Sequence, residues 1–191
     1  MNQEKTPSGE LVRRMASNDR TALGELYERY RSQVYGLALA VLKNRSDAED
    51  VVQSTFVRVW DRAGTYREGN DAGAWIMTVT RNLALDWLRG RKNMVDIMSM
   101  AETLPDGDEF ASQLDRMLLD HLLTALDCTE RQIVMLHAVG GYTHREIARI
   151  VGKPSATVRW KYGGAVKKLQ AFLEKEDFHE NEKQVRYAAG R

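Results

Sequence analysis

The sequence THREIARIVGKPSATVRWKYGGAVKKLQAFL, residues 143–173, contains two helix-forming segments separated by a short turn. Thr143 and Glu146 have the spacing of a capping box, in which each side chain satisfies a free backbone N–H group at the start of a helix. Gly152 stands where the first helix would end, because glycine accepts the left-handed backbone of a helix C-cap. Ser155 then provides an N-cap for a second helix. The stretch therefore predicts a pair of helices.

The residues at the crossing of these helices have the spacing of a helix-turn-helix. Ala148 is small enough for the helices to cross closely, Gly152 accommodates the turn, and Val158 locks the second helix. The polar, basic and aromatic residues of this unit suit the major groove of DNA, where Arg binds guanine and Lys or a helix N-terminus holds phosphate. The residues that we expect to contact DNA are Thr143, Arg145, Ser155, Thr157, Arg159, Trp160 and Lys161.

The simplest alternative for this unit is a helical hairpin with a solvated basic face. Three features disfavour it: the spacing at the helix crossing, the paired capping signals, and a net charge of +6 over residues 129–175. Just upstream, residues 129–132 form a further capping-box pattern, and Gly140-Gly141 stands where another helix would end. A stripe of apolar residues predicts one more helix before it: Leu114, Met117, Leu118, Leu122 and Leu126.

The first half of the chain contains its own set of amphipathic helices. From residue 20 to residue 43, apolar residues recur at intervals of three and four residues, as on one face of a helix, and Asp19 is placed as the N-cap. A capping box at residues 46–49 opens a second helix, and an apolar stripe from Ile76 to Leu88 defines a third. A shorter helix over residues 11–16 precedes them. No strand-like alternation of useful length occurs.

The predicted architecture is therefore all-α, with two small helical domains joined by an acidic linker, the second a four-helix domain with the helix-turn-helix. The domain boundaries follow from these patterns: 1–92 for the first domain, 93–112 for the linker, 113–175 for the second domain and 176–191 for a polar tail. The linker contains Pro105, Gly107 and a group of acids without sustained periodicity.

Charge is segregated along the chain, although 28 Lys and Arg residues nearly balance 27 Asp and Glu residues. Residues 20–92 carry a net charge of +3, residues 93–128 carry −7, and residues 129–175 carry +6. Two basic blocks around an acidic strip suggest two surfaces that meet a polyanion. On charge alone, solvated faces explain the pattern equally well.

Two faces in the first half are further candidates. The expected outer face of the second helix carries Asp47, Asp50, Gln53 and Val57, and an acidic face with one apolar residue could bind a basic helix of a partner. The third helix and the loop before it combine aromatic residues with Arg and Asn, as binding of unpaired bases requires. Trp75 lies off the apolar stripe of that helix, whereas Trp87 lies on it and is expected in the core.

The composition and motifs argue against several other classes of protein. The single cysteine, Cys128, forms neither an internal disulfide nor a zinc site, which favours a cytoplasmic protein. The longest apolar stretch, residues 34–42, is too short to span a membrane, and the N-terminus has no apolar signal core. We found no phosphate-binding loop, histidine pair for zinc or nucleophile elbow. We expect no enzyme activity, cofactor, metal or small-molecule substrate.

Three strings resemble the extracytoplasmic-function (ECF) sigma factors of bacterial RNA polymerase, the members of the sigma-70 family with regions two and four only. Residues 46–60, SDAEDVVQSTFVRVW, resemble the part of region two that binds the polymerase clamp. Residues 74–89, AWIMTVTRNLALDWLR, resemble the adjoining part that melts and reads the minus-ten element. Residues 140–148 with residues 157–159 resemble the helix-turn-helix of region four, which reads the minus-thirty-five element.

The resemblance implies roles for particular residues. For polymerase binding, it implies Asp47, Asp50, Gln53, Phe56, Val57 and Trp60. For the minus-ten element, with residues 64–73 as the pocket for a flipped base, it implies Tyr66, Arg67, Asn70, Trp75, Arg81, Asn82 and Arg89. The implied partners are core RNA polymerase, promoter DNA and a cognate anti-sigma factor, without insertion into a membrane. The chain departs from the family at Trp160-Lys161 and at Gly163-Gly164, so a promoter sequence cannot be transferred from relatives.

The sequence therefore predicts an alternative sigma factor that directs promoter-specific initiation. Two other interpretations stay open at this point. One is a helix-turn-helix transcription regulator with a sensory N-terminal domain and no polymerase docking. The other is an adaptor that does not bind DNA, such as a decoy for an anti-sigma factor.

Overall fold

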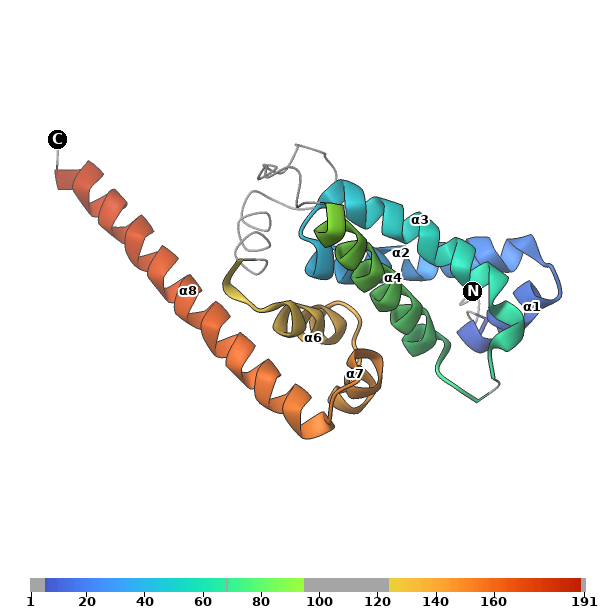
Figure 1. The fold of residues 1–191 in the computed structure, drawn as a ribbon. Coiled ribbons are helices and arrows are strands. Elements are labelled where there is room, and N and C mark those ends of the chain that lie inside the picture. Colours follow the sequence, from blue (N-terminus) through green and yellow to red (C-terminus); the bar gives the residue numbers. More distant parts are fainter. Residues whose placement is uncertain (1–5, 68, 95–123, 190–191) are drawn as a thin grey trace, which may run out of the picture.

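The computed structural model describes residues 6–67, 69–94 and 124–189 of the chain (Figure 1). In these ranges every regular element is helical, which confirms the all-α fold class. The elements are α1 (Ser8–Ala16), α2 (Arg20–Leu42), α3 (Arg45–Asp61), a 3-10 turn η1 (Ala63–Thr65), α4 (Ala72–Met94), α6 (Cys128–Ala138), α7 (His144–Val151) and α8 (Ser155–Ala189). None of these helices is both long enough and apolar enough to cross a membrane. Most of the predicted linker, and the apolar stripe from Leu114 to Leu122, lie outside the described residues.

The caps at the helix starts were predicted correctly at two positions and wrongly at three, one of which is Ser155, the first helical residue of α8 instead of its N-cap. The Asp19 carboxylate accepts the Thr21 N–H at the start of α2, and Thr143 forms the predicted capping box with Glu146. At the start of α3, however, the cap is Asn44. At the start of α6 it is Asp127, which forms a capping box with Glu130. In both cases an Asx residue with extended backbone lies two positions before the expected Ser or Thr, and its side-chain oxygen reaches the free N–H groups first.

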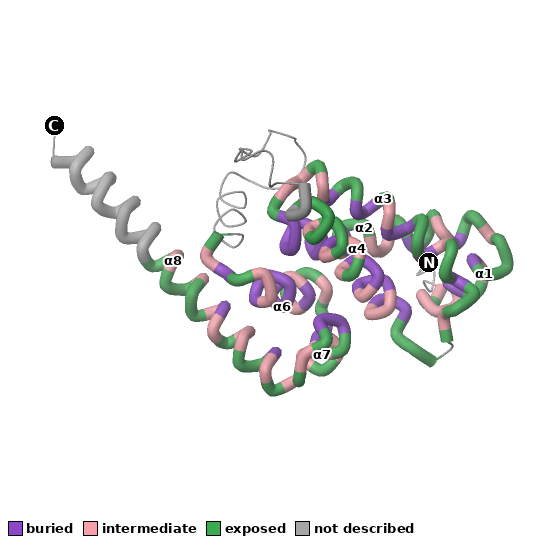
Figure 2. The backbone as a smooth tube through the Cα atoms, in the orientation of Figure 1, coloured by how far each residue is buried: buried purple, intermediate pink, exposed green. Residues whose placement is uncertain are grey.

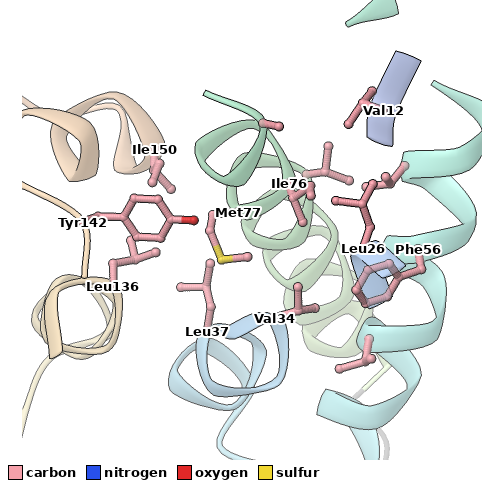
Figure 3. Packing of buried hydrophobic residues seen from close by; sticks show 14 of the residues in the cluster. Val12, Leu26, Val34, Leu37, Phe56, Ile76, Met77, Leu136, Tyr142 and Ile150 are labelled. Carbon is pink, nitrogen blue, oxygen red and sulfur yellow. The ribbon is translucent and has the colours of Figure 1, made fainter. Parts of the chain in front are cut away.

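Helices from both halves of the chain share one hydrophobic core. Helices α1 to α4 form an N-terminal set and helices α6 to α8 form a C-terminal set. Contacts of α6 with α2, and of α7 with α4, join the two sets. Figure 3 shows the junction, where Leu136, Tyr142 and Ile150 of the C-terminal set face Leu37 and Met77 of the N-terminal set. The halves therefore pack against each other instead of forming separate globules.

Close approach at this junction depends on small residues. A Cβ atom on Gly73 of α4 would lie 2.7 Å from the Tyr142 hydroxyl oxygen and 3.0 Å from that of Tyr30. On Gly36 of α2, a Cβ atom would lie 2.6 Å from the Met135 methyl carbon. Because a side chain would occupy the space of these groups, both glycines allow the C-terminal set to approach α2 and α4.

Helix α6 lies between α2 on one side and α8 on the other, and Figure 2 shows that much of it is buried. Three consecutive polar residues, Glu130, Arg131 and Gln132, are each less than 7% exposed. The Glu130 carboxylate accepts a hydrogen bond from Lys168 Nζ of α8 at 2.7 Å. A helix that is covered on opposite sides has no continuous solvated face, so its pattern is not simply amphipathic.

Arg131 provides a buried polar link between the two sets. Its Nε donates to the carbonyl oxygen of Ala40 at 2.7 Å, and its Nη1 donates to the carbonyl oxygen of Leu126 at 2.6 Å. Ala40 lies in the last turn of α2, where a carbonyl has no partner in its own helix. The guanidinium therefore caps the C-terminus of α2, where the helix dipole favours a cation. Burial lowers the pKa of Arg131.

Helix α8 extends through to Ala189, past residue 173, where the stretch with the helix-turn-helix spacing ends. Val158 and Ala165 are fully buried on this helix, whereas Leu173 is 45% exposed. The helix thus leaves the core well before it ends. Residues 176–189, predicted as a polar tail, continue this helix.

We predict that Arg131→Met lowers the free energy of unfolding by about 2–4 kcal/mol, because charged hydrogen bonds to two buried carbonyl groups are lost. Urea unfolding followed by circular dichroism measures the change. Arg58→Met, at an exposed position of α3, serves as the control and should stay within about 0.5 kcal/mol of the parent. A loss at Arg131 no larger than that of the control would show that this residue does not hold the two sets together.

Candidate functional site

The helix-turn-helix consists of α7, a tight turn and the first turns of α8. Thr143 Oγ1 accepts the Glu146 N–H at 3.3 Å, and the Glu146 carboxylate accepts the Thr143 N–H at 2.8 Å. The Thr143 hydroxyl donates to the same carboxylate, and these bonds lower the pKa of Glu146. Gly152 ends α7 with φ +65°, and Val158 is fully buried. The turn geometry predicted from the sequence is therefore confirmed.

The predicted DNA-contacting residues of this unit differ in exposure. Arg145, Arg159 and Trp160 are exposed, and the indole of Trp160 reaches 75%. Ser155 and Thr157 are half-buried. The helix-turn-helix thus presents Arg159 and Trp160 together on an open face of α8.

The Lys161 side chain, next to Trp160 in the chain, is engaged within the fold. Its Nζ donates to the Asp127 carboxylate at 2.7 Å, at the N-terminus of α6. This hydrogen bond raises the pKa of Lys161. Burial alone would raise the pKa of Asp127, but the bonds from Lys161 and from the Glu130 N–H bring it below its ordinary value. Lys161 must release Asp127 before it can contact DNA.

A cluster of aromatic rings joins the three helices of the C-terminal set. The imidazoles of His137 and His144 stack with centroids 5.0 Å apart, and the ring of Tyr162 lies 4.6 Å from His137 and 5.1 Å from His144. His137 Nδ1 lies 2.9 Å from the carbonyl oxygen of Tyr142. Burial, with the nearby His137 and Arg159, lowers the pKa of His144. Both histidines, scattered in the sequence, therefore act as structural residues at the base of the helix-turn-helix.

The loop before α4 and the start of that helix form a second candidate surface. The rings of Tyr66 and Trp75 lie 5.5 Å apart, and the Tyr66 hydroxyl donates to the carbonyl oxygen of Asn70. Both rings are half-buried, while Arg67 and Asn70 are exposed. The structure therefore brings these predicted residues together, with a partly open aromatic pair beside exposed polar groups.

Further along α4, the three predicted residues have different surroundings. Asn82 and Arg89 are exposed, and Arg89 Nη1 pairs with Asp86 at 2.9 Å. Arg81 is half-buried, and its Nε donates to Gln132 Oε1 of α6 at 2.7 Å. No sequence pattern points to Gln132, because its contact with Arg81 forms only where α6, packed on α2, comes near α4. Trp87 is 39% exposed, so its predicted place in the core was wrong.

The outer face of α3 is the third candidate surface. Asp50, Gln53 and Val57 are exposed along it, and Val57 reaches 62%. Asp47 is half-buried and forms an ion pair with Arg91 of α4. Trp60 is also only partly exposed.

Phe56 requires a correction, because it is 5% exposed and belongs to the core. Its ring packs against Tyr27 of α2 with centroids 4.9 Å apart. Direct contact between Phe56 and a partner is therefore not possible in this fold. The side chain instead packs between α3 and α2, on the side of α3 opposite its exposed face.

Two models of known protein regions match the chain. Sigma-70 region 2 matches residues 26–94, and Sigma-70 region 4 matches residues 116–169. The first match contains the surfaces of α3 and α4, and the second contains the helix-turn-helix. The chain belongs to the ECF sigma factors of the sigma-70 family. Its function is promoter-directed initiation of transcription by RNA polymerase.

Curated ECF sigma factors are similar to the chain over most of its length. The ECF RNA polymerase sigma factor SigK of Mycobacterium bovis (strain BCG / Pasteur 1173P2) is 27% identical over 172 residues, which cover 86% of this chain and 92% of the relative. The ECF RNA polymerase sigma factor BldN of Streptomyces coelicolor is 28% identical over 172 residues, which cover 86% of this chain and 65% of BldN.

Two solved structures have a fold similar to that of the chain. CnrH in complex with the cytosolic domain of CnrY has a TM-score of 0.68 and 24% identity, covering 88% of this chain and 97% of the solved chain. The sigma factor RpoE in complex with the anti-sigma factor NepR from Bartonella quintana has a TM-score of 0.68 and 20% identity, covering 78% of this chain and 97% of the solved chain.

The histidine cluster makes the stability of this sigma factor depend on pH. Because the pKa of His144 is lower in the folded state than its ordinary value of 6.5, the unfolded chain binds a proton first as the pH falls. The stabilising contribution is complete above about pH 6.5 and is lost as the pH falls through the folded pKa. We predict a lower melting temperature at about pH 5.5 than at about pH 7.5, and a smaller difference for His144→Gln. If the variant showed the same pH dependence as the parent, His144 would not be the group responsible for it.

Proposed function

We propose that this ECF sigma factor binds core RNA polymerase through the exposed face of α3 and binds promoter DNA through two other surfaces. The helix-turn-helix would bind the minus-thirty-five element, and the loop before α4 together with α4 would melt and read the minus-ten element. In this proposal residues 1–92 and 113–175 are the functional units, 93–112 is the acidic linker and 176–191 is the tail. The protein acts in the cytoplasm, and RNA synthesis is the work of the polymerase.

The observation that carries the upstream assignment is the exposure of Arg159 and Trp160 on the first turns of α8. The surrounding segment, Thr143 to Phe172, contains seven Lys and Arg residues and a single acidic residue, Glu146. Such a surface attracts the phosphate backbone, and Arg159 can form bidentate bonds with guanine. Ser155, one turn before Arg159, is a further candidate contact on the same side of α8, and Thr157 is a candidate on another side.

The pair Tyr66 and Trp75 supports the assignment of this surface to the minus-ten element, because both rings can stack with an unpaired base. The exposed side chains of Arg67, Asn70 and Asn82 are available for the backbone and base edges. Arg81 is engaged with Gln132 of α6 and must give up this contact before its guanidinium can bind the melted strand. Use of Arg81 Nε by the melted strand would therefore require Gln132 to release it.

We also propose that a cognate anti-sigma factor binds this protein. The solved RpoE chain is in complex with the anti-sigma factor NepR, and the solved CnrH chain is in complex with the cytosolic domain of CnrY. Pull-down with the full chain as bait, followed by identification of the bound proteins, tests the proposal. A bound protein that leaves transcription directed by the chain unchanged would contradict it.

We predict that Asp50→Lys weakens binding to core polymerase by about tenfold, because a reversed charge faces a basic partner surface. Binding is measured with labelled protein and purified core enzyme. Glu49→Lys is a matched control, since Glu49 also lies at the start of α3 but its charge faces Tyr35 of α2. Equal losses in both variants would mean that the exposed α3 face does not dock the polymerase.

We predict that Arg159→Ala weakens binding to the upstream element by about 1–3 kcal/mol and leaves binding to core polymerase unchanged. Run-off transcription with core polymerase on a promoter library, read by sequencing, supplies the promoter and measures the loss. Arg149→Ala, also exposed in the same unit, is the control and should keep most of the activity. If the chain neither initiates transcription nor forms a complex with core, the sigma assignment is wrong and a helix-turn-helix regulator becomes the better explanation.

A further inference from the structure

Trp160 is the most exposed large apolar side chain among the described residues, at 75%. It is the sixth residue of α8, within the part of a recognition helix that enters the major groove. One turn before it lies Ala156, and one turn after it lies Gly163, both exposed on the same side of the helix. The indole therefore stands on the open face of α8 between two positions without bulky side chains.

The fold gives no reason for the glycines that follow. A Cβ atom on Gly163 or Gly164 would meet no other atom within 4 Å, and neither residue adopts a positive φ. Alanine at each position would favour the helix by about 1 kcal/mol. Among the residues that the structure describes, neither packing nor backbone conformation requires these glycines, so this side of α8 is open to close approach by another molecule.

The charges around this face indicate that the other molecule is DNA. Arg159 adjoins Trp160, and Lys167 is exposed two turns further along α8. Lys161 Nζ, which pairs with Asp127, lies 5.9 Å from the centre of the indole ring. A positively charged surface suits a polyanion better than an apolar peptide. Within the major groove, the only apolar group on the base edges is the C5-methyl of thymine.

We propose that Trp160 is a specificity-determining residue, which selects thymine in the upstream promoter element by packing its indole against the C5-methyl group. Gly163 and Gly164 let the helix lie close enough to the groove for this contact. This inference rests on the proposed function, because it assumes that the helix-turn-helix binds promoter DNA. It adds an apolar contact to the polar contact expected of Arg159.

The test uses holoenzyme assembled from the full chain and core polymerase. Duplexes with a randomised upstream element are selected with the parent and with Trp160→Ala. We expect the parent to enrich a thymine at one or two positions, and the variant to lose that preference while it keeps the rest of the motif. Trp87→Ala, an exposed tryptophan on α4, is the matched control and should leave the preference intact.

A second step isolates the methyl group. In the selected duplex each thymine is replaced by deoxyuridine, which removes only the methyl. We expect one replacement to weaken binding of the parent holoenzyme by about threefold to fourfold, and to have no effect on Trp160→Ala. Gly163→Leu should bind the same duplex more weakly while its melting temperature does not fall.

Several outcomes would overturn the inference while leaving the sigma function intact. They are an upstream motif without thymine dependence, an equal deoxyuridine penalty in parent and Trp160→Ala, or loss of core binding in Trp160→Ala, which would make the face a protein-docking surface. Failure of the proposed function looks different, since the parent would then form no holoenzyme or select no upstream motif.

Discussion

The hydrogen bonds of Arg131 constrain the whole arrangement. A buried guanidinium is tolerated only when its N–H groups have acceptors, and here the acceptors are the carbonyl of Ala40 at the end of α2 and that of Leu126 just before α6. This pairing fixes the position of α6 on α2. With α6 held there, Met135 lies against Gly36, and Tyr142 lies against Gly73 at the start of α4. The shared core, and much of the surface that remains exposed, follow from that contact.

Packing of the two helix sets affects the three candidate surfaces differently. The α3 face with Asp50 and Val57 stays open, and so does the α8 face with Arg159 and Trp160. On α4, by contrast, α6 engages Arg81 through Gln132. In the arrangement described here, the surfaces proposed for polymerase and for the upstream element are accessible, while part of the surface proposed for the melted strand is occupied. Release of Arg81 by Gln132 would make this guanidinium available to the proposed surface.

The accuracy of the sequence-based predictions depended on the range of the interactions that decide each feature. Helix positions and the turn at Gly152 follow from contacts within a few residues, and these predictions were confirmed. Caps were less certain, because Asn44 and Asp127 compete with nearby Ser and Thr for the same free N–H groups. Predictions that depended on tertiary packing failed at two residues: Phe56 was expected to contact the polymerase, and Trp87 was expected in the core. The first is covered by Tyr27, whereas the second lies on an apolar stripe that the described helices do not cover completely.

By itself, the sequence determined the all-α class, the helix-turn-helix and the family, because apolar periodicity, capping residues and short motifs act locally along the chain. It also determined which side chains are candidates for binding DNA or the polymerase. Only the tertiary structure decided which of them are free to do so. Whether Arg81 contacts solvent or Gln132, and whether Lys161 points outward or pairs with Asp127, depends on residues 34 to 51 positions away in the sequence. Such pairs meet only when burial of one common core brings α4, α6 and α8 together.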